Sequence, residues 1–267
     1  MVRYIHFSFV SHKGRGRSMN QDNFICNRQY MKIKNDDTEF PLAGHISTAA
    51  PTLFGIFDGL GGEECGEIAS FIAAEKASTA AIGKDAIADV TKYCMETNEE
   101  ICKYARDNYI SAMGTTAALL AFTSTEIVLC NIGDSKVFRF SKGMMEQISK
   151  DHVTVSAYGT KPPLTQNLGI PASELLIEPY IAVGEYINND IYLICSDGLT
   201  DMVQPDEIKS ILNDTEFDET AGKLLNKAME NGGKDNISVI VCRIEYNIGR
   251  MINKILKKKE KVTNHDD

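Results

Sequence analysis

Four aspartates stand at the ends of apolar runs in this sequence, each next to a glycine or an asparagine. Asp58 follows LFGIF, Asp134 follows IVLCNIG, Asp197 follows IYLICS and Asp235 precedes NISVIVCRI. An aspartate after a single strand is most often a turn residue, because its side chain can hydrogen-bond the following backbone. A repeated arrangement is different, because aspartates at the ends of neighbouring strands would lie close together in the fold.

Carboxylates crowded in this way must take up protons or bind cations. Two unit charges about 4 Å apart repel by about 4 kcal/mol at an effective dielectric constant of about 20. Ligand sets made only of oxygen select hard ions such as Mg²⁺, Mn²⁺ or Ca²⁺ over Zn²⁺. Asp22, which follows Asn20-Gln21, and Asp201, which lies four residues beyond Asp197, are further candidates. No D-x-D-x-D-G run of an EF-hand occurs, so we interpret the set as a carboxylate cluster for hard metal ions.

Other catalytic chemistries lack their motifs. Cysteine-based phosphatases need arginine six residues after the cysteine, and none of the seven cysteines has one there. The sequence contains no H-E-x-x-H, no G-x-S-x-G and no Walker motif. Gly59-Leu60-Gly61 follows an apolar run as a dinucleotide loop would, but Glu64 takes the place of the third glycine.

The composition favours one reduced, globular protein. With 267 residues, 43% of them apolar, the chain can bury a sizeable core, and a net charge of −9 argues against a nucleic-acid partner. Seven cysteines without a CxxC pair indicate a cytoplasmic location, and we find no signal peptide or membrane-spanning run. We expect a monomer with a single domain over residues 1–245, without stable membrane insertion.

Hydrophobic periodicity predicts the elements that would position the aspartates. We expect residues 35–51 to be a polar insertion with turns. The helix expected over 85–107 should bury Ile87, Val90, Cys94, Ile101 and Ala105. Strands are predicted over 4–10, 24–34, 53–57, 115–122, 127–131, 137–140, 144–148, 191–195 and 237–244, and helices over 63–81, 85–107, 205–212 and 220–230. Strands in hairpins and helices in pairs predict an α+β fold of antiparallel sheets covered by helices.

Residues 246–267 form a basic C-terminal tail. Five apolar residues in it share one helical face, ahead of a lysine-rich run: Ile248, Met251, Ile252, Ile255 and Leu256. Such a tail can contact an anionic membrane or a partner protein, but a solvated, frayed end is the more ordinary interpretation.

Six sequence blocks, taken in order, resemble the metal-dependent protein phosphatases (the PPM or type-2C family), particularly the compact bacterial serine/threonine phosphatases. The blocks are RSMNQD at 17–22, FDGLGG at 57–62, GTT at 114–116, GDS at 133–135, SDGLTD at 196–201 and GGKDN at 232–236. The resemblance covers about residues 4–245. It implies an α/β/β/α sandwich, in which two antiparallel sheets are flanked by helix pairs.

The resemblance also implies a centre of two metal ions, Mn²⁺ or Mg²⁺. One ion would be held by Asp58, Asp197 and Asp235. Asp58 would bridge to the second ion, which takes the Gly59 carbonyl and, through water, Asp22. Two such ions share a water and lower its pKa, and the resulting hydroxide would attack phosphorus directly, with no phosphoenzyme.

A third, weaker ion would lie at Asp134 and Asp201, with help from Asp197. Arg17 would bind the substrate phosphate through its bidentate fork, which makes it a catalytic residue alongside Asp58, Asp197 and Asp235. A surface role for Arg17 is the plainer alternative.

Several neighbours of the aspartates are expected to be structural. Asn20 and Asn236 should fix loops by hydrogen bonds, Thr115 and Thr116 should satisfy buried backbone, and His152 should support its loop.

Two features depart from the family pattern. Leu60 stands where many relatives have a histidine that has been cast as the leaving-group acid, so a water must protonate the alkoxide here. The segment 153–169, where the family carries a flap, is short and contains glycine and proline, so we expect a loop there.

The resemblance implies hydrolysis of phosphoserine and phosphothreonine on proteins, in signalling, opposite a serine/threonine kinase. Two alternatives stay open at this point. One is a pseudophosphatase that only binds phosphoproteins, and the other is a phosphatase of small-molecule phosphates.

Overall fold

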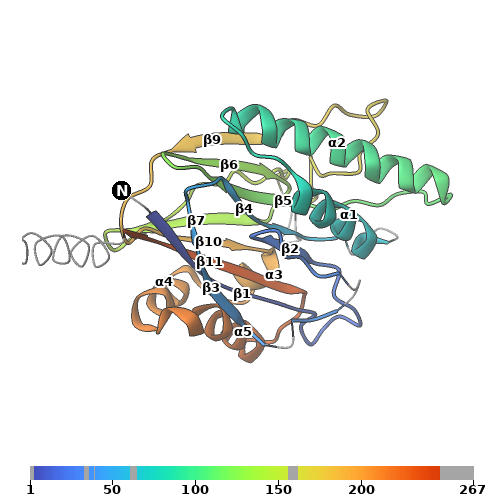
Figure 1. The fold of residues 1–267 in the computed structure, drawn as a ribbon. Coiled ribbons are helices and arrows are strands. Elements are labelled where there is room, and N and C mark those ends of the chain that lie inside the picture. The colour runs from blue at the N-terminus through green and yellow to red at the C-terminus, as the bar shows by residue number, and fades with distance from the viewer. Residues whose placement is uncertain (1–2, 33–35, 39, 61–64, 156–161, 247–267) are drawn as a thin grey trace, which may run out of the picture.

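Two antiparallel β-sheets lie face to face at the centre of the fold (Figure 1). The computed structural model describes residues 3–32, 36–38, 40–60, 65–155 and 162–246. One sheet has the strand order β3 (Leu42–Ser47), β1 (Arg3–His12), β11 (Ile237–Tyr246), β10 (Ile191–Cys195), β7 (Lys136–Ser141), β8 (Met144–Gln147). The other has the order β2 (Asn23–Cys26), β4 (Thr52–Phe57), β5 (Ala117–Phe122), β6 (Ile127–Ile132), β9 (Tyr180–Gly184).

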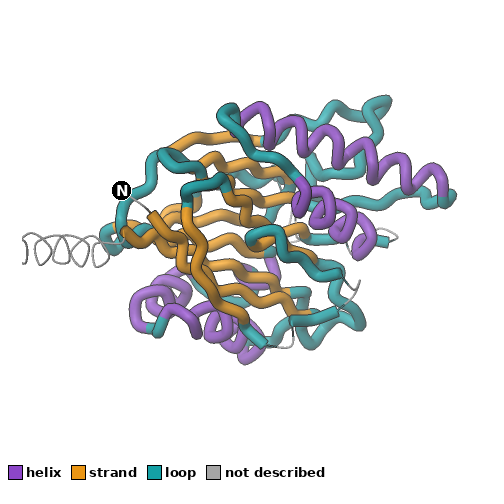
Figure 2. The backbone as a smooth tube through the Cα atoms, in the orientation of Figure 1, coloured by secondary structure: helices purple, strands orange, loops and turns teal. Residues whose placement is uncertain are grey.

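Helices cover the outer face of each sheet (Figures 1 and 2). Helices α1 (Gly66–Thr79) and α2 (Ala86–Asp107) lie on the β2–β9 sheet, and α4 (Pro205–Asp214) and α5 (Thr220–Glu230) lie on the β3–β8 sheet. A short helix, α3 (Asp197–Thr200), follows β10, and a 3₁₀ turn, Phe217–Glu219, precedes α5. This arrangement is the predicted α/β/β/α sandwich, so the predicted fold class is confirmed.

The strand β4 is covered on both faces, which explains why its sequence is almost entirely apolar. Phe54 and Ile56 face the core between the sheets, whereas Leu53 and Phe57 face the core under α1 and α2. A strand covered on both faces needs apolar residues at successive positions rather than alternate ones. The same applies to β10, whose bounds agree with the prediction, and both strands lead directly into predicted site aspartates.

Three predictions about the elements are wrong. The strand expected over 24–34 ends at Cys26, because Asn27 and Arg28 have left-handed φ angles of 49° and 67° and turn the chain. The expected insertion 35–51 contains β3, an edge strand in which no residue is buried and which pairs with β1 alone. Ile87 is 46% exposed, because it lies on the solvent side of the first turn of α2.

The other predicted helices agree with the structure to within a few residues, although the short helix α3 was not predicted. α5 has the predicted bounds, and Pro205 begins α4, where a missing N–H costs nothing. Asp85 caps α2 by accepting a hydrogen bond from the Ala88 N–H. The apolar face predicted in the tail, like Glu63 and Glu64 before α1, lies outside the described residues. Among the described helices, none is both long and apolar enough to cross a membrane.

Candidate metal centre

At one end of the sandwich, backbone hydrogen bonds join neighbouring segments within each sheet, and the hydroxyls of Ser196 and Ser238 link the two sheets through Asp22. The Ser196 N–H after β10 donates to the Ser238 carbonyl in β11, at 3.1 Å. The Gly59 N–H after β4 donates to the Gln21 carbonyl before β2, at 3.2 Å. Segments far apart in the sequence therefore lie together at this end, where Asp58 and Asp235 are neighbours of Asp22.

Asp22 is the most buried of these carboxylates, with 2% of its surface exposed. The hydroxyls of Ser196 and Ser238 donate to its Oδ2 atom at 2.8 and 2.7 Å. Its other oxygen, Oδ1, is buried and receives no hydrogen bond from the described residues. Burial, together with the nearby charge of Asp235, raises the pKa of Asp22 to about 6, although the two serine hydroxyls oppose this shift. The Asp58 carboxyl also lies within hydrogen-bonding reach of Asp22.

Asp58 is positioned by the two threonines after Gly114. The Thr115 hydroxyl donates to the Asp58 carbonyl at 3.0 Å, and the Thr116 hydroxyl accepts from the Asp58 N–H at 3.0 Å. Both hydroxyls thus satisfy buried backbone, as expected. Only glycine fits at position 59, because a Cβ there would lie 2.4 Å from the Gly66 carbonyl oxygen.

Arg17 and Asp235 form a bidentate ion pair at the same place. Arg17 Nε donates to Asp235 Oδ1 and Nη2 donates to Oδ2, both at 2.8 Å. The hydrogen bonds that Arg17 donates to Asp235, with the nearby charges of Asp235, Asp58 and Asp22, raise the pKa of Arg17. The Arg17 side chain is 41% exposed, so the guanidinium lies on the solvent side of the cluster. A predicted phosphate-binding residue therefore lies next to the predicted metal ligands.

The two asparagines hold the surrounding loops. Asn236 accepts from the Gln21 N–H at 2.8 Å and donates to the carbonyls of Lys13 and Met19, both at 2.9 Å. Asn20 donates to the Ser11 hydroxyl at 3.0 Å. These contacts confirm the expected loop-fixing roles.

Asp197 and Asp201 lie on and beside α3. Asp197 is 3% exposed and begins the helix, and its carbonyl accepts from the exposed Asp201 N–H at 2.8 Å. α3 lies so close to the start of β11 that a Cβ on Gly198 would be 1.9 Å from the Asn236 carbonyl oxygen. This contact holds Asp197 beside the segment that carries Asp235.

Asp134 is connected to the cluster through hydroxyl groups. It is 7% exposed, and the hydroxyl of the next residue, Ser135, lies 2.7 Å from the Thr116 hydroxyl that holds Asp58. His152 holds the same loop, since its N–H donates to the Gly133 carbonyl at 2.9 Å. His152 therefore has the expected structural contacts.

The residues present fit a hard divalent cation. The metal-binding groups are carboxylates and a backbone carbonyl, which suits Mn²⁺ or Mg²⁺. The buried Asp22 Oδ1 is an acceptor to which none of the described residues donates. Within the described residues, no three of these carboxylates each place an oxygen within 4.8 Å of the other two. Arg17 provides the positive charge that faces Asp235 here.

Ser196 and Ser238 also belong to the candidate site, and the sequence patterns considered above did not point to them. Both have buried hydroxyls that hold Asp22. A signal was available, because Ser238 is the one polar residue in the run 237–242 and Ser196 directly precedes Asp197.

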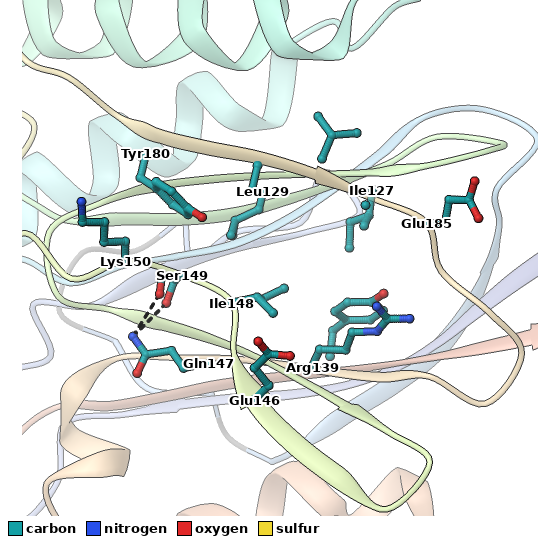
Figure 3. A pocket seen from close by; sticks show the side chains of 14 residues that line it. Ile127, Leu129, Arg139, Glu146, Gln147, Ile148, Ser149, Lys150, Tyr180 and Glu185 are labelled. Carbon is teal, nitrogen blue, oxygen red and sulfur yellow. Dashed lines mark hydrogen bonds between the residues drawn. The ribbon is translucent and has the colours of Figure 1, made fainter.

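A separate cavity of about 490 Å³ lies between the free edges of the two sheets (Figure 3). Its lining includes Ile127, Leu129, Arg139 and Tyr180, from β6, β7 and β9. None of the predicted site residues lines it. The carboxylate cluster at the strand ends is thus distinct from this cavity.

Comparison with protein families gives one match over most of the chain. The family model described as protein phosphatase 2C matches residues 35–238. The serine/threonine phosphatase stp of Listeria innocua is 28% identical over 264 residues, which cover 91% of this chain and 97% of that protein. The serine/threonine protein phosphatase PstP of Mycobacterium tuberculosis is 28% identical over 238 residues, 84% of this chain and 45% of that protein.

Solved structures agree with the fold. The crystal structure of M. tuberculosis PstP superposes with a TM-score of 0.75 and 24% identity, over 91% of this chain and all (100%) of that one. The PstP catalytic domain in complex with two manganese ions gives a TM-score of 0.73, also with 24% identity and the same coverage.

Proposed function

The chain belongs to the protein phosphatase 2C family, and we propose that its strand-end aspartates serve the removal of phosphate from serine and threonine side chains of proteins. The observation that carries this proposal is the environment of Asp22. Its buried Oδ1 receives no hydrogen bond from the part of the chain that the structure describes, while Asp58 and Asp235 lie near Asp22. Burying carboxylates close together costs free energy, and a bound cation offsets this cost.

We assign the ligands as the sequence suggested. Asp58, Asp197 and Asp235 would hold one Mn²⁺ or Mg²⁺ ion, and Asp58, the Gly59 carbonyl and Asp22 would hold a second. The manganese-bound PstP structure supports the choice of ion. When bound, such ions supply Lewis acidity and lower the pKa of a coordinated water toward neutrality.

A weaker third ion belongs to the same proposal. Its ligands would be Asp134 and Asp201, with Asp197 shared. The exposed position of Asp201 at the end of α3 is in keeping with weak binding.

The chain's own residues supply orientation and charge. Ser196 and Ser238 fix Asp22, and Thr115 and Thr116 fix the Asp58 backbone. The Arg17 guanidinium would leave Asp235 and bind the substrate phosphate instead, because its planar fork fits two phosphate oxygens as well as two carboxylate oxygens. Its partly exposed position leaves it free to meet a phosphate that arrives from solvent.

The substrates we propose are phosphoproteins modified by a serine/threonine kinase, in a signalling pathway of the cytoplasm. The relatives are named as serine/threonine phosphatases, which supports the substrate class. Seven free cysteines, six of them buried, support a reducing compartment. We propose residues 1–245 as one catalytic domain that acts as a monomer.

Hydrolysis assays on two substrates test this proposal. p-Nitrophenyl phosphate and a phosphothreonine peptide are assayed with Mn²⁺, with and without EDTA, for the wild type, Asp58→Asn and the surface control Asp214→Asn. We expect EDTA and Asp58→Asn to lower turnover by roughly 10³-fold or more, since charge stabilisation of several kcal/mol is removed. Asp214→Asn should match the wild type.

Each alternative has its own outcome in these assays. Activity that survives in EDTA or in Asp58→Asn contradicts the metal-dependent mechanism. A peptide rate no better than that of the aryl ester favours a phosphatase of small molecules. Tight phosphopeptide binding without turnover identifies a pseudophosphatase.

A further inference from the structure

A second group of potential metal ligands lies on the outer face of the β3–β8 sheet, apart from the carboxylate cluster. His6 of β1 pairs directly with His45 of β3, and Glu245 lies on the adjoining strand β11. Among the described residues, these three are the one set of histidine, cysteine or carboxylate residues whose donor atoms all lie within 4.8 Å of one another. We propose that this histidine cluster, His6, His45 and Glu245, binds a divalent transition metal ion of the Zn²⁺ type.

The buried member, His6, is already oriented as a metal-binding histidine would be. It is 7% exposed, and its Nε2 atom hydrogen-bonds the Asp218 carboxylate from the 3₁₀ turn. If Nε2 carries the proton, the Nδ1 lone pair points the other way, and Nδ1 lies 3.3 Å from Glu245 Oε1. A carboxylate that holds the second ring nitrogen is the usual support of a metal-bound histidine, because it fixes the tautomer and raises the basicity of the ligand.

A cation already lies between these two acceptors. Arg243 Nη2 lies 3.2 Å from His6 Nδ1 and donates to Glu245 Oε1 at 2.8 Å, while the guanidinium lies over the Phe217 ring. Two facing acceptors would otherwise repel, so the place requires positive charge. The Arg243 side chain is 33% exposed and can turn into solvent. A metal ion would therefore compete with Arg243 for the same position.

His45 provides the third ligand. Its Nε2 lies 3.8 Å from Glu245 Oε2, and its ring stacks on His6 with centroids 3.8 Å apart. Zinc bonds of about 2.0–2.2 Å place tetrahedral ligands about 3–3.5 Å apart, so small movements are enough. The stacked ring must turn to aim its lone pair, which its 53% exposed side chain permits.

The donor types separate this cluster from the aspartates. Imidazole nitrogens with one carboxylate suit Zn²⁺, whereas ligands made of oxygen alone suit Mn²⁺ and Mg²⁺. The cluster joins three neighbouring strands, and β3 is otherwise held in its sheet by β1 alone. A bound ion would fasten this edge strand, so it should stabilise the folded protein by mass action.

Zinc uptake in the presence of excess Mn²⁺ tests the proposal, because Mn²⁺ fills the carboxylate cluster first. Binding is followed by competition with a chromophoric zinc chelator, and the melting temperature is recorded with and without Zn²⁺. We expect one zinc equivalent in the wild type, with a rise in melting temperature. His45→Gln should weaken binding at least about tenfold and abolish the rise.

Three further variants separate the explanations. Asp58→Asn should still bind the zinc equivalent, and His12→Gln, a histidine elsewhere on β1, should bind like the wild type. Arg243→Gln should bind more tightly, since the competing cation is gone. Cobalt as a probe should give a visible absorption band of nitrogen-ligated, tetrahedral Co²⁺ that His45→Gln loses.

The opposite results would overturn the assignment. No zinc uptake by the wild type, or uptake lost in Asp58→Asn but kept in His45→Gln, shows that the histidine cluster is not the site. Weaker binding by Arg243→Gln would also contradict it, because Arg243 would then be a support rather than a competitor.

Discussion

The surroundings of Asp22 favour the binding of a cation. One of its oxygens accepts hydrogen bonds from two serine hydroxyls, and the other is buried near further carboxylates with no donor among the residues that the structure describes. A buried acceptor left unsatisfied costs about 1–3 kcal/mol, and more when it is charged. The serines hold the carboxylate in one orientation, so that Oδ1 is the atom left to bind.

Ser238→Ala tests whether this hydroxyl positions Asp22. Loss of one hydrogen bond should weaken the apparent Mn²⁺ affinity by roughly tenfold or more, as for other groups that orient metal ligands. The rate at saturating Mn²⁺ should change little. Activity is measured as a function of Mn²⁺ concentration, with Ser70→Ala, a buried serine of α1, as control. An unchanged Mn²⁺ dependence in Ser238→Ala would show that the hydroxyl has no such role.

Leu60 carries a prediction about proton transfer. Its N–H is bound to the Gly114 carbonyl at 3.1 Å, so the residue is fixed at the cluster, but its side chain cannot donate a proton. We expect aryl phosphates with good leaving groups to react faster than alkyl phosphates. Leu60→His would add a general acid, which should speed the alkyl esters more than the aryl esters and so reduce the difference between their rates. A well-placed general acid raises a rate by about 10²-fold or more. Equal wild-type rates for the two ester types would contradict this account.

At the scale of elements, the sequence was most informative where strands are covered on both faces. β10 and α5 could be placed from their apolar residues and the glycines that follow them. β3 and β9 could not, because short edge strands with exposed side chains look like loops. These two segments are strands because they pair with β1 and β6, and such pairing between distant segments cannot be read from the local sequence.

The contact between α3 and the start of β11 gives a prediction at this scale. Gly198→Ala would place a methyl group 1.9 Å from the Asn236 carbonyl oxygen and push apart the segments that carry Asp197 and Asp235. Overpacking of this kind costs about 1–3 kcal/mol, or about 2–4 °C in melting temperature for each kcal/mol in a protein of this size.

Thermal unfolding and activity should therefore both fall in Gly198→Ala. Gly83→Ala is the control, because a Cβ there meets only the Asp89 carboxylate, at 3.4 Å. A Gly198→Ala protein as stable and active as the control would mean that this close approach does not position the two aspartates.

At the scale of the whole molecule, most of the candidate site could be found from the sequence. The site aspartates follow or precede apolar runs, and the order of their blocks matches one family, so a common site for them could be predicted. The partners of Asp22 and the pairing of Arg17 with Asp235 could not, because both join segments roughly 170–220 residues apart whose contacts arise only in the folded sandwich.

The crowded aspartates should make the metal-free protein less stable than it could be. Asp58→Asn removes one charge from the cluster, so in EDTA the variant should melt a few degrees above the wild type, given roughly 1–4 kcal/mol for a close pair of like charges. In Mn²⁺ the order should reverse, because the wild type gains binding energy that the variant lacks. Scanning fluorimetry measures both. A variant that melts lower than the wild type in EDTA would contradict the repulsion.

The central claim is that divalent cations bind between aspartates contributed by distant parts of the chain. Titration calorimetry with Mn²⁺ on the metal-free protein measures this directly. We expect at least two equivalents in the wild type, the tighter one lost in Asp235→Asn and the total reduced in Asp58→Asn. A wild-type protein that takes up no manganese, or variants that take up as much as the wild type, would contradict the account.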